Sequence, residues 1–110
     1  MATTLDFMEY VYEQVQGIGA IRYRKMFGDY MLYLNDKPAL LICDNTVYVK
    51  KLLCNEAFMK DADVGFPYDG AKEHYILDID QGEKCKQLLV LMEPYLSLPK
   101  KKKRSIKVQD

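Results

Sequence analysis

Residues 30–50 read YMLYLNDKPALLICDNTVYVK, and this stretch decides the fold. Three apolar runs, at residues 30–34, 39–43 and 46–50, are separated by the short polar sequences NDK and DN. Aromatic and β-branched residues favour strands, whereas Asn and Asp tolerate the backbone of tight turns. Connections this short join antiparallel neighbours. The stretch therefore predicts three consecutive antiparallel strands, with the apolar run ALLIC in the middle of the sheet.

A helix is predicted before this block. Thr3 or Thr4 can cap it, and apolar residues then recur at helical spacing as far as Val15. Gly17 ends the helix, because glycine readily adopts the left-handed conformation that follows a helix C-terminus. The alternating sequence of residues 21–24 is read as extended chain leading into the first strand.

The second half of the chain predicts a short helix at residues 55–61, a strand at residues 73–79 and a last helix. Asp80 and Glu83 resemble a capping box at the start of the last helix, and Pro94 ends or kinks it. The order is α-β-β-β-α-β-α, with room for a second late strand near residues 65–68. Helices on one face of a mainly antiparallel sheet make a two-layer α+β domain.

Length and charge divide the chain into two parts. Its 110 residues have the size of one domain, expected at residues 1–98, followed by a basic and disordered tail at 99–110. Residues 1–99 contain 10 Lys or Arg and 15 Asp or Glu, a net charge of −5, whereas residues 100–110 carry +5. The acidic N-terminus is not a signal peptide and no apolar run would span a membrane, so a cytoplasmic protein is expected.

The sequence offers few groups for catalysis. His74 is the single histidine and is expected on a strand surface. Cys43 and Cys85 occupy predicted core positions, whereas Cys54 lies near a helix start, which can lower the pKa of a thiol and make it reactive. No metal-ligand spacing and no glycine-rich phosphate loop occurs. We therefore expect no enzyme and no cofactor, and treat catalysis by Cys54 or His74 as the weakest alternative.

The segment leading into the first strand of the block is the predicted partner surface. Gly28 lets the backbone turn sharply. Met26 and Phe27 are expected to pack this corner against the first helix, and the neighbouring cations form an exposed rim. The tyrosines in nearby strands suit protein interfaces. The candidate partner surface consists of Arg22, Arg24, Lys25, Met26, Phe27, Gly28, Tyr30 and Tyr33.

The basic tail is a second candidate site. A run of cations gains affinity for phosphates by releasing counterions from nucleic acid. The alternative interpretation is that the tail only keeps the protein soluble. The candidate nucleic-acid contacts are Lys100, Lys101, Lys102, Lys103 and Arg104.

The sequence RYRKMFGDYMLYLNDKPALLICDNTVYVK resembles the N-terminal domain of the TfoX/Sxy family, bacterial regulators of natural competence. Shared features are an arginine shortly before Met-Phe-Gly, a hairpin, an apolar strand and a strand ending in lysine, within a resemblance over residues 5–97. The chain departs from the family at Asp29 and Met31, where glycines are frequent. The matching positions are Arg24, Met26, Phe27, Gly28, Leu32, Tyr33, Ala39, Leu40, Tyr48, Lys50, Phe66, Tyr68 and Tyr75.

The resemblance implies a fold like that of type III secretion chaperones, and it supports the second late strand, giving α-β-β-β-α-β-β-α. It also implies regulation of transcription through protein contacts, with the cyclic-AMP receptor protein as a suggested associate. Full-length regulators carry a further helical domain, so a single-domain member is expected here. The expected function is a non-enzymatic regulatory or protein-interaction module that binds a transcription factor or a second copy. The alternative is a nucleic-acid-associated accessory protein acting through its tail.

Overall fold

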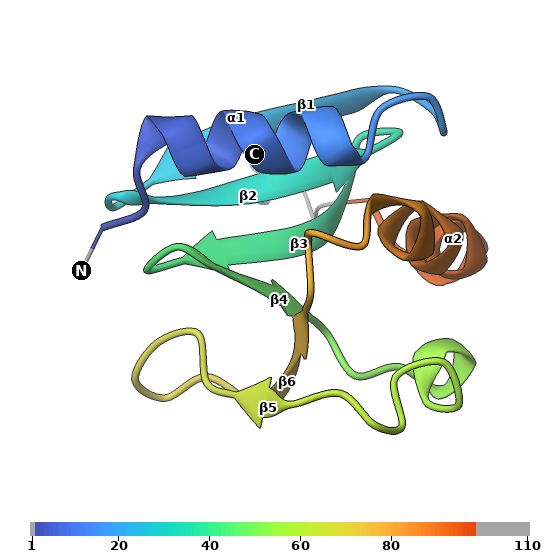
Figure 1. Cartoon of the computed structure of the whole chain (residues 1–110). Helices are drawn as coiled ribbons and strands as arrows, with labels where there is room; N and C mark the ends of the chain where they lie inside the picture. The colour runs from blue at the N-terminus through green and yellow to red at the C-terminus, as the bar shows by residue number, and fades with distance from the viewer. Residues whose placement is uncertain (1, 99–110) are drawn as a thin grey trace, which may run out of the picture.

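The computed structural model describes residues 2–98, which form one sheet covered by two helices (Figure 1). The helices and strands follow the order predicted for the fold class. In chain order they are α1 (Leu5–Gln14), β1 (Ile21–Met26), β2 (Asp29–Leu34), β3 (Lys37–Cys43), β4 (Thr46–Val49), the 3₁₀ turn η1 (Leu53–Asn55), β5 (Val64–Gly65), β6 (His74–Leu77), α2 (Gly82–Met92) and the 3₁₀ turn η2 (Glu93–Tyr95).

The six strands form a single antiparallel sheet in the order β1-β2-β3-β4-β6-β5. The first three hairpins each have a two-residue loop, formed by residues 27–28, 35–36 and 44–45. All six loop residues have positive φ, which identifies turns of type I′. The twist of these turns matches that of the strands, so the sequence of residues 21–49 folds back on itself three times without long connections.

Both helices cover the same face of the sheet, and the core lies between the two layers (Figure 1). Met8 and Val11 of α1 and Leu88 and Leu89 of α2 are buried in one cluster with the side chains of the central strands. The buried strand residues on this side include Leu32, Leu34, Leu40, Ile42, Val47 and Val49. Burial of each large aliphatic side chain contributes about 2 kcal/mol, so this layer supplies most of the driving force for folding.

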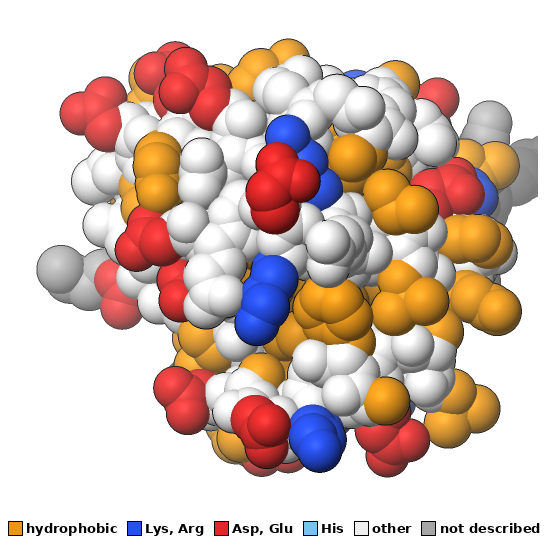
Figure 2. Space-filling view, turned by 45° about the vertical axis from the view of Figure 1, so that its right-hand side comes forward, with side chains coloured by type: hydrophobic (Ala, Val, Ile, Leu, Met, Phe, Trp, Pro, Cys, Tyr) orange, Lys and Arg blue, Asp and Glu red, His pale blue; other side chains and the backbone are white. Residues whose placement is uncertain are grey.

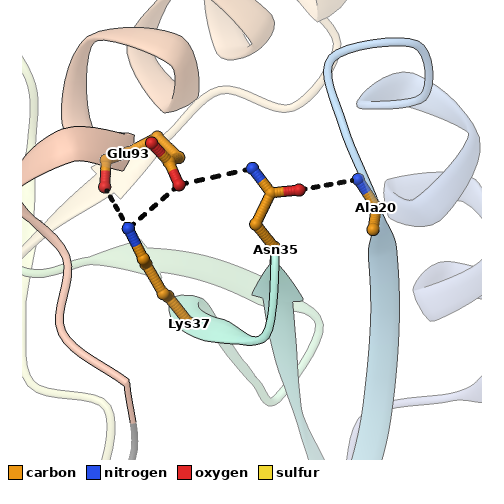
Figure 3. A network of polar contacts seen from close by, with 4 residues as sticks. All are labelled: Ala20, Asn35, Lys37 and Glu93. Atoms are coloured by element: carbon orange, nitrogen blue, oxygen red, sulfur yellow. Dashed lines mark hydrogen bonds and ion pairs between the residues drawn. The ribbon is translucent and has the colours of Figure 1, made fainter.

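A polar network closes the end of the helix layer (Figure 3). Lys37 Nζ lies 3.0 Å from Glu93 Oε2 and also donates to the Glu93 backbone oxygen. The Asn35 side chain joins Glu93 to the segment before β1: its amide nitrogen donates to Glu93 Oε2, and its oxygen accepts from Ala20 N at 3.0 Å. The β2–β3 turn therefore connects the end of α2 to the start of β1.

The α+β class, the helices on one face and the second late strand are confirmed. The extended chain before Phe27 is a full edge strand, β1, because it pairs with β2 along its whole length. The helix expected at residues 55–61 is the 3₁₀ turn η1 followed by hydrogen-bonded turns. Of the two residues predicted to cap α1, Thr4 is the N-cap, and its hydroxyl oxygen accepts a hydrogen bond from Phe7 N at 3.2 Å.

The predicted capping box of α2 is wrong. Gln81, and not Asp80, occupies the N-cap position, and its side chain caps no backbone N–H group. Asp80 instead accepts a hydrogen bond of 2.5 Å from the Tyr10 hydroxyl, which ties α1 to the segment before α2. This carboxylate raises the pKa of Tyr10, because ionising the phenol would lose the hydrogen bond and place two negative charges together. A long-range contact has overridden the local motif.

A candidate interaction surface on the helix-free face

The sheet face opposite the helices carries a row of large apolar side chains. Tyr23 of β1 packs edge to face on Tyr12 of α1, with ring centroids 5.5 Å apart, so its side chain lies on the helix side. Successive side chains of a strand alternate between the two faces, so the residues before and after Tyr23 point to the opposite face. The strand register then aligns one residue from each of five strands across the helix-free face. This row consists of Arg24, Met31, Leu41, Tyr48 and Ile76.

The four apolar members of the row are all half-buried, although no helix covers them. A solvated face of an antiparallel sheet normally alternates to polar residues, so a continuous apolar row on it is unusual. We refer to this row, together with the groove described next, as the helix-free surface. Its base consists of apolar side chains on the sheet, and such a surface is suited to binding a partner.

A groove of about 700 Å³ lies at one side of the helix-free surface. Met31, Pro38 and Leu41 contribute to its apolar lining, and Tyr68, which is 61% exposed, projects from the loop before β6. The remaining lining is mainly cationic or comes from that same loop. The charged and titratable lining residues are Lys50, Lys51, Lys72, Glu73 and His74.

Three carboxylates near this face already have partners. Asp36 pairs with Arg22 at 3.2 Å, and Glu73 pairs with Lys51. Asp29 accepts from the Thr3 hydroxyl at 2.9 Å and from Asp44 N at 3.1 Å, which gives a structural role to this departure from the family pattern.

Several cations near this face keep their charge available. Among residues 2–98, Arg24, Lys50 and Lys72 form no ion pair. The helix-free surface is therefore positive, although residues 1–99 are acidic as a whole, with 10 Lys or Arg against 15 Asp or Glu.

Two aromatic rings of the helix-free surface, those of Tyr33 and Tyr48, are engaged with neighbours. The Arg22 guanidinium lies 4.2 Å from the centre of the Tyr33 ring, which leaves Tyr33 only 7% exposed. The Tyr48 ring meets the His74 ring edge to face, with centroids 6.4 Å apart. His74 Nδ1 donates to the Lys72 carbonyl oxygen at 2.7 Å, which fixes the orientation of the imidazole.

The predicted partner surface is brought together only in part. Arg22, Arg24 and Met26 lie on the helix-free face, as expected for alternate residues of β1. Lys25 is exposed but, by the same alternation, points to the other side. Tyr30 and Tyr33, the other two tyrosines of the predicted surface, offer little exposed area, because Tyr30 is 6% exposed within the core and Tyr33 is covered by Arg22.

The prediction that Phe27 packs against the first helix is also wrong. Phe27 occupies the first loop position of the β1–β2 turn and is fully exposed, whereas Met26 is half-buried. Its φ of +52° is unfavourable for a side chain with a Cβ atom, costing roughly 1–2 kcal/mol. Gly28 follows at φ +87°, and a Cβ there would lie 3.3 Å from Ala2 Cβ, so both backbone shape and space require glycine. The turn thus presents an aromatic ring to solvent at a conformational cost.

The cysteines and the histidine considered for catalysis have different surroundings in the fold. Burial raises the pKa of Cys43 and of Cys85 to about 11, so both thiols stay protonated at neutral pH. Cys85 Sγ donates to the Asp78 carbonyl oxygen at 3.3 Å. Cys54 is half-buried against the core, while His74 lines the groove on the helix-free surface.

Other predicted features concern membranes, metals and the tail. Among residues 2–98, no group of three or more His, Cys, Asp or Glu side chains could hold a metal ion. No helix within that range combines the length and the apolar character required to cross a bilayer. The proposed nucleic-acid contacts, Lys100–Arg104, lie outside the residues that the structure describes.

Sequence reasoning missed Met31, Leu41, Ile76 and Lys72 as surface residues. One signal was available for two of them: the runs YMLYL and ALLIC are apolar at consecutive positions, so both faces of β2 and β3 must be apolar. The contribution of Ile76 and Lys72 depends on the pairing of β4 with β6, which joins segments distant in sequence.

Comparison with known proteins identifies the family. The model of the TfoX N-terminal domain matches residues 13–100, which is most of the 110-residue chain. The chain belongs to the TfoX N-terminal domain family. It is also 29% identical over 109 residues to an uncharacterized 12.7 kDa protein in the trpE 5′ region of Spirochaeta aurantia, covering 97% of this chain and 95% of that protein.

Proposed function

We propose that this TfoX N-terminal domain is a non-enzymatic regulatory module that binds an acidic surface of another protein through its helix-free surface. The observation that carries the proposal is the half-exposed apolar row flanked by unpaired cations. Apolar patches on a rigid face commonly mark protein-binding sites. The cations restrict the choice of partner, because complementary charge steers association and excludes like-charged surfaces.

A protein partner fits this surface better than nucleic acid does. Binding of single strands usually relies on free aromatic faces on which bases stack. On the helix-free surface the Tyr33 ring is covered by Arg22 and the Tyr48 ring is engaged with His74, so of its three tyrosines only Tyr68 has a largely exposed ring. The floor of the groove is mostly aliphatic, as expected for contacts with apolar side chains.

Family membership supports a regulatory role, because the TfoX/Sxy proteins that this chain resembles act in competence and transcription. The proposed partner is therefore a protein of the transcription apparatus with an acidic contact surface. The fully exposed Phe27 ring, at the tip of the β1–β2 turn, extends the surface and would enter an apolar pocket on that partner.

Site-specific photocrosslinking in the native cells tests the proposal. A photoreactive phenylalanine analogue replaces Tyr48 on the helix-free surface and, as the matched control, Tyr10 on the outer side of α1. Tyr10 is 39% exposed, so both positions can reach a bound protein. We expect a discrete crosslinked protein from position 48 that is absent from position 10, and whose yield falls at least about tenfold when Arg24→Glu is added.

Three results would contradict the proposal. Equal labelling from positions 48 and 10 would show that the surface has no selectivity. Products from position 48 that disappear after nuclease treatment would point to nucleic acid as the ligand. A yield unaffected by Arg24→Glu would remove the role of charge. Arg24 is exposed, so its replacement should leave the core intact. Circular dichroism checks that each variant is folded.

A further inference from the structure

A second exposed apolar region lies on the side of the molecule formed by α2 and η1. Figure 2, in which the right-hand side of Figure 1 has come forward, shows hydrophobic side chains gathered over its right half with few charges among them. The exposed fractions in this region reach 93% for Leu53 and 67% for Tyr95. The α2–η1 patch consists of Leu53, Phe58, Val90, Leu91 and Tyr95.

The members of the α2–η1 patch are held together by the packing of η1 against α2. Asn55 in η1 is fully buried, and its side-chain nitrogen lies 3.5 Å from Met92 Sδ at the end of α2. Phe58 and Gln87 of α2 line one and the same hollow. Leu91 and Tyr95 are four residues apart, so they share one side of the helical segment that runs from α2 into η2.

Few charged side chains lie among the hydrophobic ones in Figure 2, although Asp61 and Lys84 line the same hollow as Phe58. The Glu93 carboxylate, two residues after Leu91 in the sequence, is held by Lys37 and Asn35. With about 200 Å² for a large apolar side chain, the five residues expose roughly 600 Å² per molecule. Interfaces of standard size bury about 800 Å² per partner, so the patch and a polar rim provide enough area for one stable contact.

We infer that the α2–η1 patch is the contact surface for a second copy of this chain, packed about a two-fold axis. Residues 1–99 carry 15 acidic and 10 basic groups, so two copies repel each other unless they meet where charge is absent. Depletion of charge and a mainly apolar composition are typical of the core of homodimer interfaces. The helix-free surface is unsuitable for self-contact about a two-fold axis, because its unpaired cations would face their own copies. In the dimer each subunit keeps its helix-free surface for the partner.

The polar tail is a poor cover for this patch. Residues 99–110 include six Lys or Arg and only two aliphatic side chains, those of Ile106 and Val108. If the tail covered the apolar patch, its cations would lose their contact with water and gain no carboxylate or hydrogen-bond partner in return.

Sedimentation equilibrium of the full-length chain tests the dimer. We expect wild type to be dimeric, and Leu53→Glu to raise the dimer dissociation constant by at least about tenfold, because two buried carboxylates would face each other across the axis. The matched control is Leu5→Glu, at a residue of α1 that is 52% exposed and outside the patch. Its dissociation constant is expected to stay within about twofold of wild type.

A second variant separates loss of contact from loss of folding. Leu53 is 93% exposed, so its replacement leaves the core intact, and Val90→Lys, at a residue 54% exposed on the outer side of α2, should weaken the dimer in the same way. A monomeric wild type, or a dimer that both variants leave intact, would overturn the inference. The photocrosslinking from position 48 does not depend on the dimer, so the two proposals can fail separately.

Discussion

The two faces of the sheet are both apolar, but they are used differently. On the helix side, Leu40 is 1% exposed beneath α1 and α2. Its neighbour Leu41 points the other way and is half-buried in the row that crosses the helix-free surface. Equal hydrophobicity at two consecutive positions thus serves folding on one face and, in our proposal, binding on the other. Apolar character alone does not distinguish these roles; the layer that covers each face does.

Charge distinguishes the two exposed apolar regions in the same way. The helix-free surface has Arg24, Lys50 and Lys72 without ion pairs among residues 2–98, whereas few charged side chains lie among the hydrophobic ones of the α2–η1 patch, and the neighbouring Glu93 carboxylate is held by Lys37 and Asn35. A surface with one sign of charge selects an unlike partner, and an uncharged surface permits contact with a copy of itself. We therefore assign the first to another protein and the second to self-association.

The largest expected effect separates the two faces of β3. Leu40→Ala should lower the free energy of unfolding by about 3 kcal/mol, because it leaves a cavity in a core that cannot collapse around it. Leu41→Ala should cost about 1 kcal/mol, because the side chain is half-buried and has water on one side. Urea denaturation followed by circular dichroism measures both.

The same pair of variants should rank in the opposite order for binding. At temperatures where both are folded, Leu41→Ala should reduce crosslinking from position 48 more than Leu40→Ala does. Equal stability losses for the two leucines would mean that the helix-free surface is as well covered as the core, and the distinction between the faces would be lost.

A smaller effect of opposite sign is expected at the β1–β2 turn. Phe27→Asn should raise the free energy of unfolding by about 1 kcal/mol, because asparagine tolerates the positive φ that strains phenylalanine. The replaced ring is fully exposed, so no buried contact is lost. If Phe27 contacts the partner, the stabilised variant should bind it less well.

Thermal unfolding of Phe27→Asn beside Phe27→Ala provides the control for the turn. Alanine removes the ring but keeps the unfavourable φ, so only asparagine should stabilise. A stabilised variant with unchanged crosslinking would place Phe27 outside the partner surface.

The smallest effect concerns the network that closes the helix side. The hydrogen bond from Lys37, assisted by Asn35, lowers the pKa of Glu93 from its usual value of 4.5. The folded state therefore binds this proton less readily than the unfolded state. The resulting stabilisation is present above pH 4.5 and is lost as the pH falls through the lowered pKa.

Glu93→Gln should remove this part of the acid sensitivity. The difference in urea midpoint between wild type and variant is expected to shrink on going from neutral pH to below pH 4.5. Glu83→Gln, at a surface carboxylate that is 87% exposed, serves as the control. A Glu93→Gln difference that stays constant with pH would show that the network acts through shape and not through charge.

Much of the fold could be predicted because its signals are local. The turns at residues 35–36 and 44–45 use Asn and Asp at positive φ, and the alternation of TVYV assigns Val47 and Val49 to the core side. The failures arose where distant groups compete with local ones. Asp80 was predicted to cap α2 but accepts a hydrogen bond from the hydroxyl of Tyr10. Phe27 was predicted to pack against the first helix but is fully exposed at the tip of a hairpin.

The candidate site was less predictable than the fold. The cations of β1 could be recognised because they lie next to one another in the sequence. The apolar row could not, because it takes one residue from each of several strands, and their alignment depends on the register of the pairing.

The amino-acid sequence by itself determined the antiparallel hairpins, the two amphipathic helices and the excess of acidic groups in the domain, because turn chemistry, periodicity and charge are properties of neighbouring residues. Only the tertiary structure decided which apolar residues of the sheet are covered by the helices and which stay exposed. That choice depends on how the covering layer packs and on which strands become neighbours, and neither is set by any single segment of the chain.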